Sequence, residues 1–402
     1  MSLSRNAAFF LQASIVVSFL AGSSAPTPLY AVYQAAWGFS PITVTVVFGI
    51  YAIAVLAALL VLGSISDYVG RRPVLVGAAL LQAVTMVVFA TAHGVSALVA
   101  ARVLQGFATG AAMSAVGAGM VDIDRARGAT ANAVGPMLGS ATGGLLSGFL
   151  VQYLPAPTVL VYALLGVVFV LQALGVLAMP ETAARRPGAL AALKPRFELP
   201  AALRRPMLLA APAIIGTWAL VGFYASLGPT LLHVLSGSGS RLLGGLALFA
   251  LAGPGAVAIL FTRAVSPQNL MKIGTATLIA GIAATLAAVR ADSVSGFFAG
   301  TAVAGAGFGG AFQGAVRSVV PRAAPHERAG VLSVLYVIAY LAMGLPAVLA
   351  GVGVVFGGGV LRTANEYGAA VMLLSALAFA GSVTARASVT LAERVDAVPS
   401  RP

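Results

Sequence analysis

Apolar runs of about 20 residues make up most of this chain, and short polar segments separate them. A run of this length forms a helix that can cross the hydrocarbon core of a bilayer. Unpaired peptide groups are costly in hydrocarbon, so only helices and closed barrels span membranes, and these runs lack the alternation of barrel strands. With 60% hydrophobic and 8% charged residues among 402, the sequence predicts an all-α membrane protein.

Twelve spans are predicted, at residues 8–30, 42–62, 74–93, 96–120, 129–152, 158–179, 208–232, 242–262, 270–290, 295–317, 329–352 and 367–387. The first could instead be a cleaved signal peptide, with Arg5 before an apolar stretch and small residues after Leu20. We favour a membrane span, because its removal would break the internal repeat described below.

Basic residues fall mainly on the side of the predicted membrane that holds both termini, whereas Arg241, Arg290 and Arg362 are on the opposite side. Basic loops tend to stay cytoplasmic, so we expect a multi-pass protein of the cell (inner or plasma) membrane with both termini in the cytoplasm. The net charge of +13 then reflects topology and contact with the lipid bilayer, and it argues against a nucleic-acid partner.

The spans carry few groups with reactive chemistry. The chain has no cysteine, all ten acidic residues lie outside the predicted spans, and the three histidines lie at span ends or in loops. The sequence therefore predicts no enzyme active site, no metal site and no cofactor. Proton-coupled carriers usually hold a titratable group inside the membrane, so coupling to protons would need a group at a span end or a charge on the substrate.

A short pattern in the first span is repeated in the seventh. Four residues match at a constant separation: Ser23, Pro26, Thr27 and Leu29 with Ser226, Pro229, Thr230 and Leu232. Between the repeats, residues 180–207 are rich in Pro, Ala and Arg. We predict two six-helix halves, residues 1–179 and 208–402, joined by a cytoplasmic linker at 180–207, with a substrate site between them near the midplane.

The loop after the second span clusters charge and glycine at Gly63, Asp67, Gly70, Arg71 and Arg72. A glycine-permitted turn with a few fixed charges suits a contact that breaks when a protein changes conformation. The loop resembles the Gly-x-Leu-Ala-Asp-Arg-x-Gly-Arg-Lys pattern of the major facilitator superfamily, with Tyr68 where arginine is usual. The resemblance covers nearly the whole chain. It implies a transporter of two pseudo-symmetric six-helix bundles, in which this loop latches the halves together on the cytoplasmic side.

The fourth span contains Arg102, with Gln105 three residues later on the same helix face. An arginine at membrane depth is costly and normally faces a bundle interior or a wet cavity. The alternative is a side chain that reaches out to the membrane surface. Together with Gly106, the pair resembles the family pattern Leu-x-x-x-Arg-x-x-Gln-Gly, which implies a role in substrate handling or proton coupling.

The fifth span places Gly135, Gly139 and Gly143 four residues apart, with Pro136 among them. Small residues at this spacing let helix backbones approach closely, and the proline bends the helix. The Gly-Pro-x-x-Gly core is similar to a pattern of the family's twelve-helix drug and metabolite exporters. The resemblance implies export, whereas close packing alone would explain the glycines equally well.

Neutral polar and aromatic residues within the spans are the candidates for lining a substrate cavity: Asn132, Trp218, Tyr224, Gln313, Tyr336 and Tyr340. Tyr336 and Tyr340 share one helix face. Tyr30 and Tyr33 fit better as aromatic residues of the membrane interface.

These observations favour a secondary transporter that works by alternating access and exports small amphipathic or weakly charged organic compounds. We expect a monomer that binds a small-molecule substrate, and coupling to protons is left open. The alternatives are a facilitative carrier or importer of a neutral metabolite such as a sugar, and a membrane receptor or scaffold that transports nothing.

Overall fold

The computed structural model describes residues 3–195, 197–324 and 326–396, and within these ranges all regular structure is helical. The first six spans are α1 (Arg5–Ser24) with α2 (Pro26–Trp37), α3 (Pro41–Leu62), α5 (Arg71–Ala90), α6 (Val95–Ile123), α7 (Arg125–Tyr153) and α8 (Pro157–Leu177). The last six are α10 (Ala201–Ser226) with α11 (Gly228–Ser236), α12 (Arg241–Phe261), α13 (Pro267–Arg290), α14 (Val294–Val319), α15 (Arg328–Phe356) and α16 (Val360–Asp396). Shorter helices are α4 (Ser66–Val69), α9 (Ala189–Ala192) and the 3-10 turn η1 (Val320–Arg322). Parts of the predicted halves and linker lie outside the described residues, namely 1–2, 196, 325 and 397–402.

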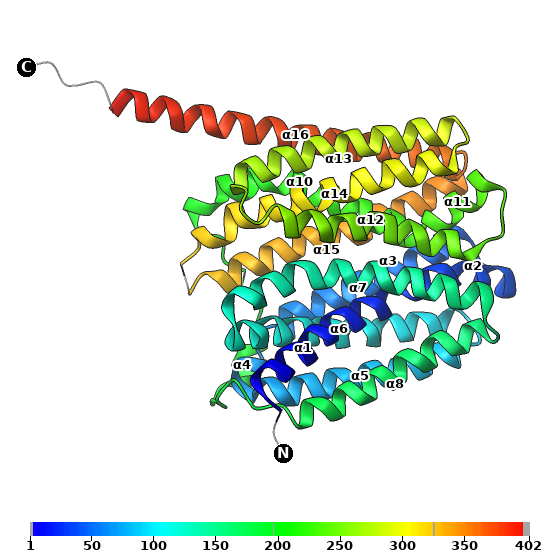
Figure 1. Cartoon of the computed structure of the whole chain (residues 1–402), viewed down its shortest axis with the longest axis horizontal. Helices are drawn as coiled ribbons and strands as arrows, with labels where there is room; N and C mark the ends of the chain where they lie inside the picture. Colours follow the sequence, from blue (N-terminus) through cyan, green and yellow to red (C-terminus); the bar gives the residue numbers. More distant parts are fainter. Residues whose placement is uncertain (1–2, 196, 325, 397–402) are drawn as a thin grey trace, which may run out of the picture.

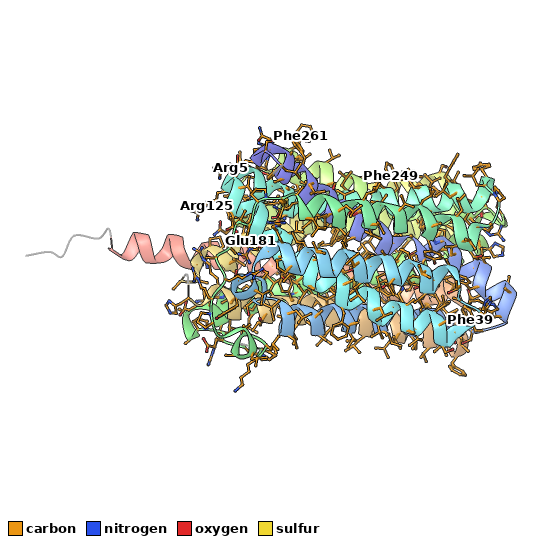
Figure 2. The ribbon with its side chains drawn as sticks, turned by 90° about the horizontal axis from the view of Figure 1, so that it is seen from below. Arg5, Phe39, Arg125, Glu181, Phe249 and Phe261 are labelled. Carbon is orange, nitrogen blue, oxygen red and sulfur yellow. The ribbon has the colours of Figure 1, made fainter. Side chains whose placement is uncertain are left out.

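Within the described residues, twelve helical segments are long and apolar enough to cross a membrane, which confirms the predicted fold class. Figure 1 shows them running across the view, with α13, α14 and α16 above and α1, α5 and α8 below. The N-terminus lies at the end of the bundle from which α16 extends, and we call this the terminal end and the opposite one the distal end. Figure 2 shows the labelled Arg5, Arg125 and Glu181 at the terminal end and Phe39 at the distal end.

The outside of the bundle is apolar, as contact with lipid requires. On α8, Val167, Leu171 and Leu174 are all exposed, Leu171 at 61%. Water would penalise so large an exposed apolar surface, whereas hydrocarbon does not.

Proline breaks both the first and the seventh span, although each was predicted as one continuous helix. The breaks fall at Ala25, before Pro26, and at Leu227, just before Gly228 and Pro229. Proline has no backbone N–H, so the carbonyl four residues earlier loses its helical donor. The sequence repeat is therefore a pair of matching helix breaks.

Hydrophobic packing divides the molecule unevenly. One cluster joins the two halves, because it combines Phe48, Tyr51 and Met137 of the first six spans with residues mostly from the distal and middle parts of the last six. A second cluster belongs only to the first six spans. A third lies at the terminal end of the last six spans, around Leu203 and Val331. The halves thus share a core at the distal end and have separate cores at the terminal end.

Glycines of α7 provide close backbone contacts on two sides. A Cβ built on Gly143 would lie 2.3 Å from the Cα of Ala21 in α1, and one on Gly139 would lie 2.4 Å from the carbonyl oxygen of Val17. Further along, the position of a Cβ on Gly148 is 3.3 Å from the Cα of Gly245 in α12. The predicted glycine spacing therefore corresponds to close helix packing, within the first half and between the halves.

We predict that Gly143→Ala destabilises the protein by roughly 1–3 kcal/mol, because the added methyl group forces α1 and α7 apart. Gly77→Ala is the matched control, because a Cβ at Gly77 has no atom within 4 Å. Thermal unfolding of the purified protein in detergent measures both. Equal unfolding temperatures for the two variants would contradict the assignment of Gly143 to a backbone contact.

Candidate functional site

Arg102 of α6 is fully buried, with 0% exposure. This result contradicts the alternative in which the side chain reaches the membrane surface. No carboxylate pairs with Arg102 among the described residues, and its partners are neutral oxygens. Burying this charge is costly, so each donor of the guanidinium needs an acceptor.

The partners of Arg102 and Gln105 lie at the break in the first span. Arg102 Nη1 donates to the carbonyl of Ser23 at 2.9 Å and to Gln105 Oε1 at 2.6 Å. Gln105 Nε2 in turn donates to the carbonyl of Gly22 at 3.0 Å. In a regular helix the carbonyl of Gly22 would accept from the backbone N–H of residue 26, and Pro26 has none. Gln105 therefore satisfies the carbonyl that Pro26 leaves free, and Arg102 donates to the carbonyl of the next residue.

Aromatic side chains enclose the guanidinium of Arg102. The Tyr30 hydroxyl accepts from Nε at 3.0 Å and from Nη2 at 2.6 Å. The ring centres of Tyr51, Tyr30 and Phe89 lie 5.1, 5.6 and 5.8 Å from its central carbon. Tyr30 and Tyr33 are both buried, so their assignment to the membrane interface is wrong. Arg102 holds Tyr30 in the interior, because its charge needs a hydroxyl acceptor, and Tyr33 donates to the hydroxyl of Tyr162 at 3.2 Å.

Gly106 faces the neighbouring helix and not the arginine's partners. A Cβ there would lie 2.4 Å from the Cβ of Ala54 in α3, so the glycine allows α6 and α3 to pack closely. Two of the three predicted residues, Arg102 and Gln105, thus contact the first span, whereas Gly106 packs against α3.

At the terminal end, Glu181 fixes the start of α5. Its carboxylate accepts from the backbone N–H groups of Arg71 at 2.8 Å and Arg72 at 3.1 Å. Gly70 precedes them with a φ of 99°, and a Cβ there would lie 2.5 Å from Glu181 Oε2. Gly70 is required on both grounds, and the carboxylate also offsets the positive end of the helix.

The side chain of Arg71 joins three elements. It pairs with Asp67 at 2.5 Å and with Asp122 at the end of α6 at 3.3 Å, and it donates to Ser66 Oγ at 2.6 Å. Arg72 donates to the carbonyl of Leu177 in α8. Gly63 caps α3 before this loop. These contacts all lie within the first half, so the latch between halves stays a prediction, with Asp67 54% exposed.

The residue that departs from the family pattern, Tyr68, contacts the linker. Its carbonyl accepts from the backbone N–H of Arg186 at 2.8 Å, and its ring lies beneath Gly188. Ser64 Oγ donates to the carbonyl of Ala192 at 3.0 Å. The loop thus binds the first part of the chain between the two halves.

Four of the aromatic residues in the last six spans form a group that we call the aromatic cluster: Trp218, Phe312, Tyr336 and Tyr340. Ring centres are 5.0 Å apart for Trp218 and Tyr340, and 5.6 Å apart for Trp218 and Phe312. All four side chains are half-buried. Trp218 and Phe312 pack against both the shared core and the terminal core of the second half. The aromatic cluster therefore lies where the two halves part.

The other cavity candidates are placed differently. Tyr224 is buried and its hydroxyl lies 2.7 Å from Thr301 Oγ1, inside the second half. Asn132 donates to the carbonyl of Gly117 at 2.9 Å, which links α7 to α6. Gln313 is half-buried beside Phe312. Tyr224 and Asn132 thus make packing contacts, and Gln313 follows a member of the aromatic cluster along α14.

Sequence reasoning missed Tyr51 and Glu181. Tyr51 lies in mid-span next to Arg102 and carries no motif that could reveal it. Glu181 follows Pro180 at the end of α8, where an acid looks like an ordinary loop residue. Its capping role depends on α8 and α5 being neighbours, which the sequence does not state.

We predict that Tyr30→Phe destabilises the protein by about 1.5–3 kcal/mol, because two donors of the buried guanidinium lose their acceptor. Tyr153→Phe is the control, because Tyr153 is exposed at the distal end of α7. Thermal unfolding of both variants tests this. A Tyr30→Phe protein as stable as the control would show that Arg102 does not depend on the hydroxyl.

Solved structures with the same fold include several transporters. Nucleoside transporter NupG aligns with a TM-score of 0.71 and 14% identity over 94% of this chain and 99% of that one. A bacterial homologue of the human lysosomal transporter Spinster, in an inward-facing and occupied conformation, aligns with a TM-score of 0.73 and 14% identity, and the alignment covers 94% of this chain and 96% of that one. The human organic anion transporter MFSD10 (TETRAN) aligns with a TM-score of 0.65 and 18% identity, and the alignment covers 94% of this chain and 100% of that one. At these identities the likeness shows the fold.

Comparison with curated proteins finds no significant sequence match. The sequence model of the Major Facilitator Superfamily, however, matches residues 13–345, which is most of the chain. The loop at Asp67–Arg72 and the Arg102–Gln105 pair fall within this match, as do both helix breaks, at Ala25 and Leu227. The chain belongs to the Major Facilitator Superfamily.

Proposed function

We propose that this protein is a secondary transporter that works by alternating access and exports small amphipathic or weakly charged organic compounds across the cell membrane. The observation that carries the proposal is the uneven packing of its halves. They share a hydrophobic core at the distal end and have separate cores at the terminal end. The half-buried aromatic cluster lies at the boundary, where a carrier closed on one side exposes its site.

We propose that the moving bodies are residues 1–179 and 208–402, with 180–207 as the linker, and that the terminal end faces the cytoplasm. The charge distribution supports this orientation, because Arg5, Arg71, Arg72 and Arg125 are at the terminal end. The structure would then correspond to a state open to the cytoplasm.

Contacts between neutral groups close the distal side. Thr27 Oγ1 donates to the carbonyl of Ala225 at 2.9 Å, which joins the two broken helices. This is the carbonyl that Pro229 leaves without a helical donor. Nearby, a Cβ built on Gly351 of α15 would lie 3.0 Å from the Cβ of Thr45 in α3. To open outward, the protein must separate these contacts.

We propose that the terminal side closes in the opposite state through the loop at Asp67–Arg72. Asp67 has one partner on its own loop and is otherwise open to solvent. A carboxylate of this kind can accept a donor from the second half when the halves approach.

A facilitative carrier of a neutral metabolite is the second candidate, favoured by one observation. No acidic side chain lies in the middle of a span in the part of the chain that the structure describes. Such a group is the usual proton carrier, so uphill export would need a charge on the substrate.

Flux into proteoliposomes discriminates between the candidates. We expect protein-dependent flux of 2-naphthoate or 2-naphthol and none of glucose, and we expect cells that express the protein to accumulate less of either naphthyl compound. Glucose flux with neither naphthyl compound carried would favour the second candidate. Strong movement of neutral 2-naphthol against its gradient, driven by an imposed pH difference, would reveal a proton carrier outside the middle of the spans.

We predict that a disulfide between Thr45→Cys and Gly351→Cys stops this flux, because it holds the distal side closed. The built Cβ separation of 3.0 Å is slightly below the usual disulfide value of about 3.8 Å, so a small shift allows the bond. The natural chain has no cysteine, so each single variant is a clean control, and a reductant should restore flux. Undiminished flux in fully cross-linked protein would contradict alternating access.

A further inference from the structure

The indole of Trp218 has a hydrogen-bond donor that the protein leaves unused. Its Nε1 atom is buried, and no described residue accepts from it. A buried donor without an acceptor is costly, and a tryptophan in such a position usually finds a partner. Trp218 packs where the shared core meets the terminal core, beside half-buried side chains. A molecule that enters between the halves would satisfy this donor once the side chains that cover it move aside.

The neighbouring rings give that molecule a flat apolar contact. Tyr340 lies 5.0 Å and Phe312 5.6 Å from Trp218, ring centre to ring centre, and Tyr336 lies 6.5 Å from Tyr340. Partly uncovered rings at these spacings allow stacking with a planar aromatic group. A ligand that suits both features has an aromatic ring and an acceptor oxygen.

Charge then selects among aromatic ligands. Aromatic faces alone also attract cations, but the Tyr51 face already contacts the guanidinium of Arg102, 5.1 Å from its ring centre. Tyr51 and Tyr340 belong to one packed cluster, which links the surroundings of Arg102 to the aromatic cluster. Arg102 has only neutral partners, and the acids nearest along the chain are at the span ends. A buried cation without a carboxylate partner is poorly screened, so it would favour an anionic ligand over a cationic one.

We propose that the aromatic cluster binds planar aromatic anions, with Trp218 Nε1 donating to an oxygen of the ligand's anionic group. The proposal deepens the proposed transport function by naming a substrate class, and it makes Trp218 a specificity-determining residue.

Equilibrium dialysis of the full-length protein in nanodiscs tests the proposal with three matched probes. They are 2-naphthoate (an anion), 2-naphthamide (neutral) and 2-naphthylmethylammonium (a cation). We expect wild type to bind 2-naphthoate at least tenfold more tightly than the cation. Trp218→Phe should weaken 2-naphthoate binding about tenfold, the effect of losing one hydrogen bond to a charged group. Equal binding of anion and cation, or unchanged 2-naphthoate binding by Trp218→Phe, would overturn the proposal.

Two controls separate the hydrogen bond from packing. The only other tryptophan, Trp37, stacks on Tyr33 with ring centres 4.8 Å apart, and Trp37→Phe should leave 2-naphthoate binding unchanged. 2-Methylnaphthalene has no acceptor, so Trp218→Phe should bind it as wild type does. Equal weakening of 2-methylnaphthalene and 2-naphthoate would mean that the variant has lost its packing, and Trp218 would have no role as a donor.

The binding and flux experiments test the two proposals separately, so the failure of one can be told from the failure of the other. A protein that binds 2-naphthoate through Trp218 but carries nothing across the membrane retains this site and loses the transport function. A protein that carries 2-naphthol with no preference for the anion retains transport and loses the proposed site.

Discussion

The interaction on which this structure most depends is the hold of Arg102 on the broken first helix. A proline break leaves carbonyls without donors in the middle of a membrane, where no solvent can satisfy them. Arg102 and Gln105 donate to the carbonyls of Ser23 and Gly22, and Tyr30 accepts from the guanidinium. Gln105 supplies the donor that Pro26 lacks, and it also accepts from Arg102, which obtains its other acceptors from Ser23 and Tyr30 on either side of the proline. A role limited to coupling or substrate contact would not explain this pairing.

The twelve helices could be predicted because length and composition alone decide whether a segment can cross a membrane. The repeat at Pro26 and Pro229 was also visible, but its meaning was not. A proline is tolerated within a membrane helix when other groups satisfy the freed carbonyl. The sequence cannot say that Gln105 reaches the carbonyl freed by Pro26 or that Thr27 reaches the one freed by Pro229, because both contacts join segments distant in the chain. For this reason the first and seventh spans were predicted as unbroken.

The placement of individual side chains was the least predictable part. Tyr30 looked like an interfacial residue because it lies near the end of a predicted span, yet the arginine on α6 holds it inside. Asn132 looked like a cavity residue because it is polar, yet Gly117 on α6 offers a carbonyl to its amide. In both cases the partner is on another helix, and composition carries no information about which helices are neighbours. The role of Gly70 was easier to predict, because its φ of 99° reflects a local need for glycine in the turn.

The two ends of the molecule use different chemistry, and this difference suits a carrier. At the distal end, the Thr27 hydroxyl, the Gln152 side chain (which accepts from the backbone N–H of Arg241) and close glycine contacts join the halves, with no ion pair between them among the described residues. Separating such surfaces leaves no buried charge without a partner, so the cost of opening stays moderate. At the terminal end, charges are gathered around Arg71, where solvent can reach Asp67. A carrier needs two states that differ by only a few kcal/mol. Neutral closure on one side and exposed charge on the other can provide that balance, because neither state requires an ion to be buried alone.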